Sequence, residues 1–102
     1  MDDVVMCRST SINSITADGQ ELLLEQPVFI VLEEDGEEVA ARMPELEAVG
    51  FGLTEPEAIH ELKSELGALY EDLVISPDEE LGRLPLSWKR ILDNLVASSV
   101  EP

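Results

Sequence analysis

Two Asp-Gly dipeptides, at residues 18–19 and 35–36, constrain the fold of this chain more than any other feature. Each lies between runs of apolar or β-branched residues, and Asp-Gly favours the tight turns of β-hairpins because it tolerates positive φ angles at both turn positions. Two such hairpins predict an antiparallel sheet.

The two turns set the expected strand pairs. The first is expected to pair residues 4–12 with residues 20–26, and the second to pair residues 27–34 with residues 37–43. Pro27 is expected to separate the hairpins, because proline lacks the backbone N–H that a strand ladder needs.

The stretch AVGFG, residues 48–52, is typical of a further strand. Val49 and Phe51 share one face of it, while Gly50 and Gly52 share the other. Because glycine has no side chain, the glycine face is expected to let another backbone approach closely.

A capping box at Thr54 and Glu57 predicts the start of the main helix. In this motif the threonine oxygen accepts a hydrogen bond from the amide three residues on, and the glutamate reaches back. The apolar residues then advance by three or four and form one stripe: Ala58, Ile59, Leu62, Leu66, Leu69, Tyr70 and Leu73. Gly67 inside this helix is expected to cost about 1 kcal/mol relative to alanine.

Two further helix starts follow along the chain. Ser76, Pro77 and Glu79 form a second capping box, and the short turn that it begins is expected to end at Gly82. Ser87 is expected to cap a last helix, whose apolar stripe contains Trp88, Ile91, Leu92, Leu95 and Val96. The elements predict an α+β fold with an antiparallel sheet of roughly three to five strands, one main amphipathic helix on one face and a C-terminal helix.

The charge of the chain excludes several classes of partner. Its 102 residues contain 23 Asp and Glu against 6 Lys and Arg, which gives a formal net charge of −17. Such a field repels phosphate backbones and anionic membrane surfaces, so we expect no direct nucleic-acid or membrane binding. The same field speeds encounter with a basic protein, although acidity also serves solubility.

Cys7 is the only cysteine, so neither an intramolecular disulfide nor a Cys-based zinc site is expected. A single cysteine favours a reducing compartment. The start MDDVV lacks the basic residues and apolar run of a signal peptide, and no apolar stretch has the length of a membrane span. We therefore expect a cytoplasmic protein.

Two features suggest chemistry, and each has a simpler interpretation. Gly50 and Gly52 before a helix resemble a phosphate loop, but Glu55 and Glu57 in the first turn oppose phosphate, so the glycines are expected to serve strand and turn geometry. His60, the only histidine, is expected on a solvated helix face. We expect no catalytic residue, no cofactor and no metal ion, and hence no enzyme.

Five residues are the candidates for binding a partner. Four of them, Glu33, Glu34, Glu37 and Glu38, crowd the second hairpin turn. Such a cluster can gather Ca²⁺ or Mg²⁺, but the spacing is not that of an EF-hand, and a solvated turn is the simpler interpretation. The turn is also an electrostatic target for a basic partner. Trp88, the fifth, is expected in the core, although tryptophan also anchors interfaces.

The central stretch, residues 27–73, resembles the HicB-like family. Family members run strand, acidic turn, a strand ending in Pro-Asp/Glu-Leu, and then a Gly-Thr/Glu helix start with Glu-Ala. The matching residues are Pro44, Glu45, Leu46, Gly52, Thr54, Glu57 and Ala58. Where typical members have Pro-Asp-Leu-Pro-Gly-Cys, this chain has PELEAVG. On this basis residues 1–102 form a single domain, with an extra N-terminal hairpin at 1–26, the family core at 27–75 and a helical extension at 76–102.

The resemblance implies a fold similar to a partial ribonuclease H fold without that enzyme's active site. It also implies an antitoxin that binds a small basic HicA-like toxin, an mRNA-cleaving RNase, and covers its catalytic histidine. Many members carry a DNA-binding module at the C-terminus, and the stretch after the main helix is expected to be too short for one.

Two other interpretations stay open. The chain is alternatively a stand-alone homo-oligomeric HicB-like protein with no toxin partner, in which edge strands or the C-terminal helix pair between copies. The third interpretation is a metal-dependent nuclease on the ribonuclease-H-like topology. A nuclease needs several carboxylates that converge on Mg²⁺, and the charge of −17 would repel its substrate.

Overall fold

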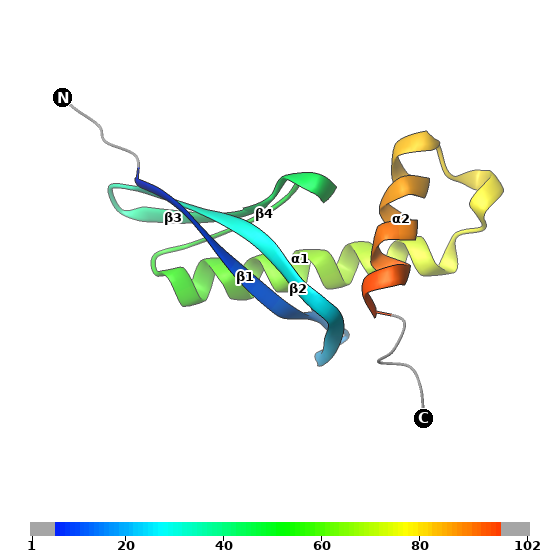
Figure 1. Cartoon of the computed structure of the whole chain (residues 1–102), viewed down its shortest axis with the longest axis horizontal. Helices are drawn as coiled ribbons and strands as arrows, with labels where there is room; N and C mark the ends of the chain where they lie inside the picture. The colour runs from blue at the N-terminus through cyan, green and yellow to red at the C-terminus, as the bar shows by residue number, and fades with distance from the viewer. Residues whose placement is uncertain (1–5, 97–102) are drawn as a thin grey trace.

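The structure is a computed structural model, and it describes residues 6–96. Four strands form one antiparallel sheet in chain order: β1 (Met6–Ala17), β2 (Gln20–Asp35), β3 (Glu38–Met43) and β4 (Ala48–Gly52). The helices are α1 (Glu55–Ile75) and α2 (Arg83–Val96), with short 3₁₀ turns η1 (Pro44–Leu46) and η2 (Asp78–Glu80). The predicted α+β fold is confirmed (Figure 1). No helix within the described range is long and apolar enough to cross a membrane.

Both Asp-Gly turns form hairpins, but their geometry differs. At the first turn Asp18 and Gly19 have φ angles of 55° and 77°, so both turn residues are left-handed as predicted. At the second turn Asp35 still belongs to the ladder, and only Gly36 has a positive φ, of 66°. The loop there is Gly36-Glu37, one residue later than predicted, because a two-residue loop that begins with glycine needs only that one positive φ.

The predicted break at Pro27 is wrong, because β2 continues through this residue and pairs with β1 along both of its halves. The part of β1 next to the turn, residues 14–17, pairs with residues 20–23. The distal part, residues 6–12, pairs with residues 28–34 rather than with the first half of β2. The second half of β2 therefore lies between β1 and β3.

A shift of register in the middle of this pair explains how β2 tolerates a proline. Residues 24–27 of β2 lie opposite Asn13 alone. Pro27 falls in this irregular stretch, where its missing N–H interrupts no regular ladder bond. The proline thus marks a bend within one strand and not the end of a hairpin.

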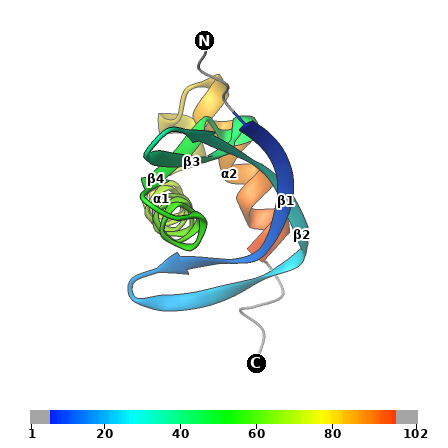
Figure 2. The ribbon, with the colours of Figure 1, turned by 90° about the vertical axis from the view of Figure 1, so that its left-hand side faces the viewer.

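The sheet curls around both helices, as Figure 2 shows along α1. Helix α1 packs against β1, β3 and β4, and α2 packs against β2 and α1, so both lie on the concave side. The space between sheet and helices is filled by the largest fully buried side chains: Ile15, Ile30, Leu32, Met43, Leu46, Leu62, Leu66, Leu92 and Val96.

Glycines allow the main helix to lie directly on the sheet. Gly50 and Gly52 face α1 as predicted, since a Cβ added to either would overlap atoms of the helix. Gly67 is their counterpart on the helix, because its Cβ would overlap the carbonyl oxygen of Thr16 in β1. Any side chain at these three positions would push the two layers apart.

The main helix begins where the capping box predicts. The hydroxyl of Thr54 accepts a hydrogen bond from the Glu57 amide at 3.3 Å. The Glu57 carboxylate accepts from the Leu53 amide at 2.8 Å, one residue before the position that the motif predicts. Both bonds occupy amides near the helix start that have no partner within the helix.

The C-terminal helices differ from the prediction. The predicted short turn after Ser76 is the 3₁₀ turn η2, but its cap residue is Pro77. Ser76 instead ends α1, and its hydroxyl donates to the carbonyl of Asp72 at 3.0 Å. Helix α2 begins at Arg83, so the predicted cap Ser87 lies inside it. Pro85 does not prevent this earlier start, because the first-turn amides of a helix need no partner within it.

Candidate protein-binding face

The convex side of the sheet, which we call the outer face, is covered by neither helix (Figure 2). The strand registers arrange its side chains in two rows that cross all four strands. One row contains Cys7, Glu33, Ala40 and Phe51, and the next contains Ser9, Val31, Arg42 and Val49. Phe29 lies beyond the second row, beside Ser11. The outer face thus has an apolar centre with few charges.

Two aromatic rings on the outer face are open to solvent. Phe29 is 77% exposed and Phe51 is 48% exposed, while Val31 and Val49 between them are half-buried. Large exposed aromatic side chains are enriched where proteins bind one another, because their burial contributes much of the binding free energy. These residues are the apolar contacts that the outer face offers.

One ion pair lies among these apolar side chains. Arg42 on β3 donates from Nε to Glu33 Oε1 on β2 at 3.0 Å, and both side chains are partly exposed. An exposed pair of this kind contributes only about 0–1 kcal/mol to stability. Because Arg42 balances its charge, Glu33 differs from the other glutamates of the turn.

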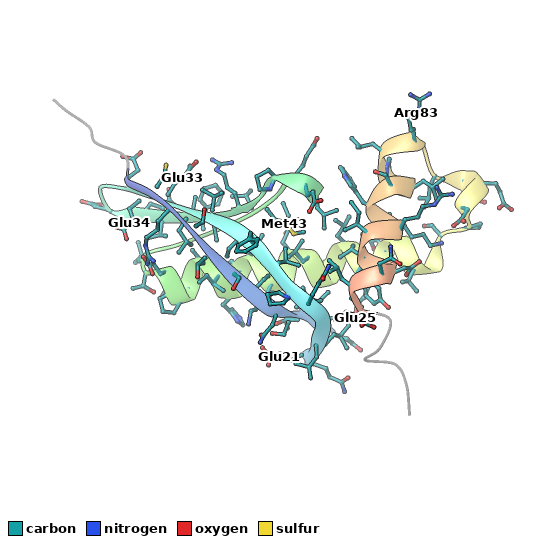
Figure 3. All side chains as sticks on the ribbon, in the orientation of Figure 1. Glu21, Glu25, Glu33, Glu34, Met43 and Arg83 are labelled. Carbon is teal, nitrogen blue, oxygen red and sulfur yellow. The ribbon has the colours of Figure 1, made fainter. Side chains whose placement is uncertain are left out.

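The acidic turn between β2 and β3 lies at the end of the outer face. Glu34, Glu37 and Glu38 are exposed, and none forms an ion pair within residues 6–96. Glu33 and Glu34 lie on opposite sides of β2, as their alternation requires (Figure 3). The uncompensated negative charge of the turn therefore lies at Glu37 and Glu38.

A second ion pair joins the start of β1 to the start of α1. The Arg8 guanidinium donates to the Glu55 carboxylate. This hydrogen bond and the charge of Arg8 hold the pKa of Glu55 below its ordinary value, and the same contact raises the pKa of Arg8. Glu34 lies close enough to add to the field at Arg8, so the acidic turn is adjacent to this pair.

The structure separates Trp88 from the four glutamates. The acidic turn lies at one end of the molecule, whose longest extent is 49 Å, and α2 lies at the other (Figure 1). Trp88 is half-buried against the core, and its Nε1 is buried with no hydrogen-bond partner in the described chain. One compact site therefore contains the glutamates but not the tryptophan.

Several side chains that suggest chemistry are dispersed. Cys7 is exposed on the outer face, and His60 is exposed on α1. Within residues 6–96 no group of three or more His, Cys, Asp or Glu side chains is arranged to hold a metal ion. No protein-family model matches this chain, and the comparisons with curated proteins and with solved structures found no match.

The exposed aromatic residues were not among the predicted contacts. The signal for them is the unbroken apolar run Val28–Leu32, because a strand that is apolar at every position has apolar side chains on both of its faces. One face of β2 meets the helices, so the other face is left with Phe29 and Val31. Phe51 follows from the same logic, because the glycines beside it face α1.

Proposed function

We propose that this chain is an antitoxin-type protein-binding module, which neutralises a small basic HicA-like mRNA-cleaving toxin through its outer face and acidic turn. The observation that carries the proposal is the outer face. It is a sheet surface left bare by both helices, with exposed Phe29 and Phe51 and with free carboxylates at one end. The proposal assigns no catalytic step to the chain, and it places the pair in the cytoplasm, in keeping with the single cysteine.

Charge governs the first stage of the proposed binding. The net charge of −17 attracts a basic protein over a range of about one Debye length, roughly 8 Å at physiological salt. The exposed carboxylates of Glu34, Glu37 and Glu38 concentrate this attraction at the turn. Encounter therefore begins at that end of the sheet.

Apolar contact governs the second stage. Burial of Phe29 and Phe51 against the partner removes two rings from water, and Arg42 beside them can donate to an acceptor on the partner. A specific interface of this kind buries roughly 800 Å² on each partner. Binding of this kind inhibits an RNase by covering its surface.

Light scattering tests the proposal with the full chain and a small basic protein encoded beside its gene. We expect a stable mixed complex that high salt weakens. Replacement of Glu34, Glu37 and Glu38 by glutamine should slow association about tenfold and flatten its dependence on salt. Phe29→Ala should instead speed dissociation, because it removes contact area rather than charge.

A matched control removes the same charge elsewhere. Glu71, Glu79 and Glu80 are exposed and lie away from the sheet, so their replacement by glutamine should leave association nearly unchanged. Equal effects of the two triple variants would remove the acidic turn from the interface. A homo-oligomer that ignores the basic protein would favour the stand-alone interpretation.

A further inference from the structure

We propose that the free edge of β4 is a second binding site, which takes an extended basic peptide as a fifth strand beside α1. Within residues 6–96, β4 has a strand neighbour on one side only, β3. A shallow hollow of about 470 Å³ runs between Phe51 and the first turns of α1. Its lining residues are Phe51, Pro56, Glu57, His60 and Glu61.

The β4 edge lacks the usual protection against strand addition. Edge strands in soluble proteins are commonly blocked by charged side chains, proline or bulges. Residues 48–54 contain no charged residue and no proline, in a chain that is 28% charged. The residues of β4 thus do not oppose pairing with another extended segment, although its five residues limit such pairing to a short stretch.

The glycines of β4 let α1 lie directly against the strand, which places the first turns of the helix beside its free edge. Gly50 and Gly52 face α1 and carry no side chains, so every second residue of an added strand would meet the helix rather than a neighbour from β4. The remaining residues of the added strand would lie beside Val49 and Phe51 on the outer face. The two faces of the groove therefore differ in chemistry.

Carboxylates on α1 make the helix side acidic. Glu61 forms no hydrogen bond or ion pair in the described part of the chain. Glu57 uses one carboxylate oxygen for the Leu53 amide, which leaves the other free. Lysine or arginine on the helix side of an added strand would reach these carboxylates, while apolar residues on its other side would contact Phe51.

Charge also decides against a second copy as the occupant. Pairing of β4 with its own copy would bring the Glu57 and Glu61 carboxylates of two chains together, each chain carrying −17. Like charges across a contact disfavour it. The site instead selects a segment in which basic and apolar residues alternate.

The test uses the full chain and a fluorescein-labelled peptide of alternating lysine with valine or threonine. A second peptide of the same composition, with the lysines in one block, carries equal charge but cannot separate the two kinds of side chain onto opposite faces. We expect the alternating peptide to bind about tenfold more tightly in fluorescence anisotropy. We also expect this peptide to change the amide NMR chemical shifts of the protein mainly at residues 49–53.

Variants locate the site. Glu61→Gln should weaken binding of the alternating peptide about three- to fivefold, whereas Glu65→Gln, an equal change at an exposed position of α1 outside the hollow, should not. Phe29→Ala should leave peptide binding unchanged. Because that variant weakens the proposed toxin contact, it distinguishes failure of this inference from failure of the proposed function.

Several results would overturn the inference. They are equal affinity for the two peptides, NMR chemical-shift changes confined to the acidic turn, and no binding at millimolar peptide concentration. Dimers in which the β4 amides are protected from hydrogen exchange without any peptide would show that a second copy occupies the edge.

Discussion

At the scale of single residues, Gly67 shows how a contact reverses a local preference. Alanine is the better helix former by about 1 kcal/mol, so the sequence predicts that Gly67 weakens α1. In the fold a Cβ at this position would overlap the Thr16 carbonyl of β1. Gly67→Ala should therefore destabilise the protein by about 1–3 kcal/mol, the usual cost of overpacking, as measured by urea unfolding.

The next residue, Ala68, allows the effect of helix propensity to be measured without the contact to β1. Ala68 is exposed on the same helix, so Ala68→Gly should cost only about 1 kcal/mol, the difference in helix propensity. If Gly67→Ala were instead to stabilise the protein by a similar amount, α1 would have to lie farther from β1 than the structure places it. No sequence pattern reveals this contact, because residues 16 and 67 meet only in the folded sheet.

At the scale of elements, α2 is fastened by a lysine whose bond depends on pH. Lys89 donates to Asp78 Oδ1 at 2.8 Å and to the Ser76 carbonyl at 2.9 Å. The hydrogen bond from Lys89, followed by its charge, holds the pKa of Asp78 below its ordinary value. A lowered folded pKa means that this contribution is present above the unfolded pKa and is lost as pH falls through the folded value.

Trp88, the only tryptophan, reports whether α2 stays docked. In an acid titration of its fluorescence, Asp78→Asn should loosen α2 relative to wild type at neutral pH. The difference should shrink as pH falls below the ordinary aspartate pKa of about 3.9, and it should vanish only below the lowered pKa of Asp78 in the folded state. Glu79→Gln, which changes an adjacent exposed carboxylate without an ion pair, should titrate like wild type. Equal titrations for Asp78→Asn and wild type would contradict the role of this bond.

Elements with local signals were predictable, and elements fixed by distant contacts were not. Three features were predicted from a few adjacent residues and are found in the structure: the turn at Asp18-Gly19, the strand at 48–52 and the start of α1. The continuity of β2 through Pro27 depends on its pairing with β1 on both sides of a register shift. At the start of α2 the predicted cap Ser87 instead donates its hydroxyl to the Leu84 carbonyl within the helix, a bond that its local sequence does not favour over capping.

At the scale of the whole molecule, charge was predictable from composition but its arrangement was not. Four cations are matched to carboxylates by the fold: Arg8 to Glu55, Arg42 to Glu33, Lys63 to Glu21 and Lys89 to Asp78. Arg8–Glu55 and Lys63–Glu21 join residues more than 40 positions apart, so no local spacing shows them. Arg42–Glu33 and Lys89–Asp78 join nearer residues, which the second hairpin and the packing of α2 bring together. Within the acidic turn Glu37 and Glu38 keep their free charge, because the fold brings Arg42 to Glu33 and Arg8 near Glu34.

The excess of carboxylates also predicts how salt changes the stability of the whole molecule. Salt weakens the four ion pairs, but their side chains are partly exposed and each contributes little. Salt also screens repulsion among the remaining carboxylates of a chain with charge −17, and this second effect should be larger. Added NaCl should therefore raise the Tm in calorimetry, by about 4–8 °C for each kcal/mol gained.

Sucrose at equal osmolality is the control, because it leaves charge unscreened. A Tm that falls with NaCl would mean that the ion pairs, and not the repulsion, dominate the electrostatic free energy of folding.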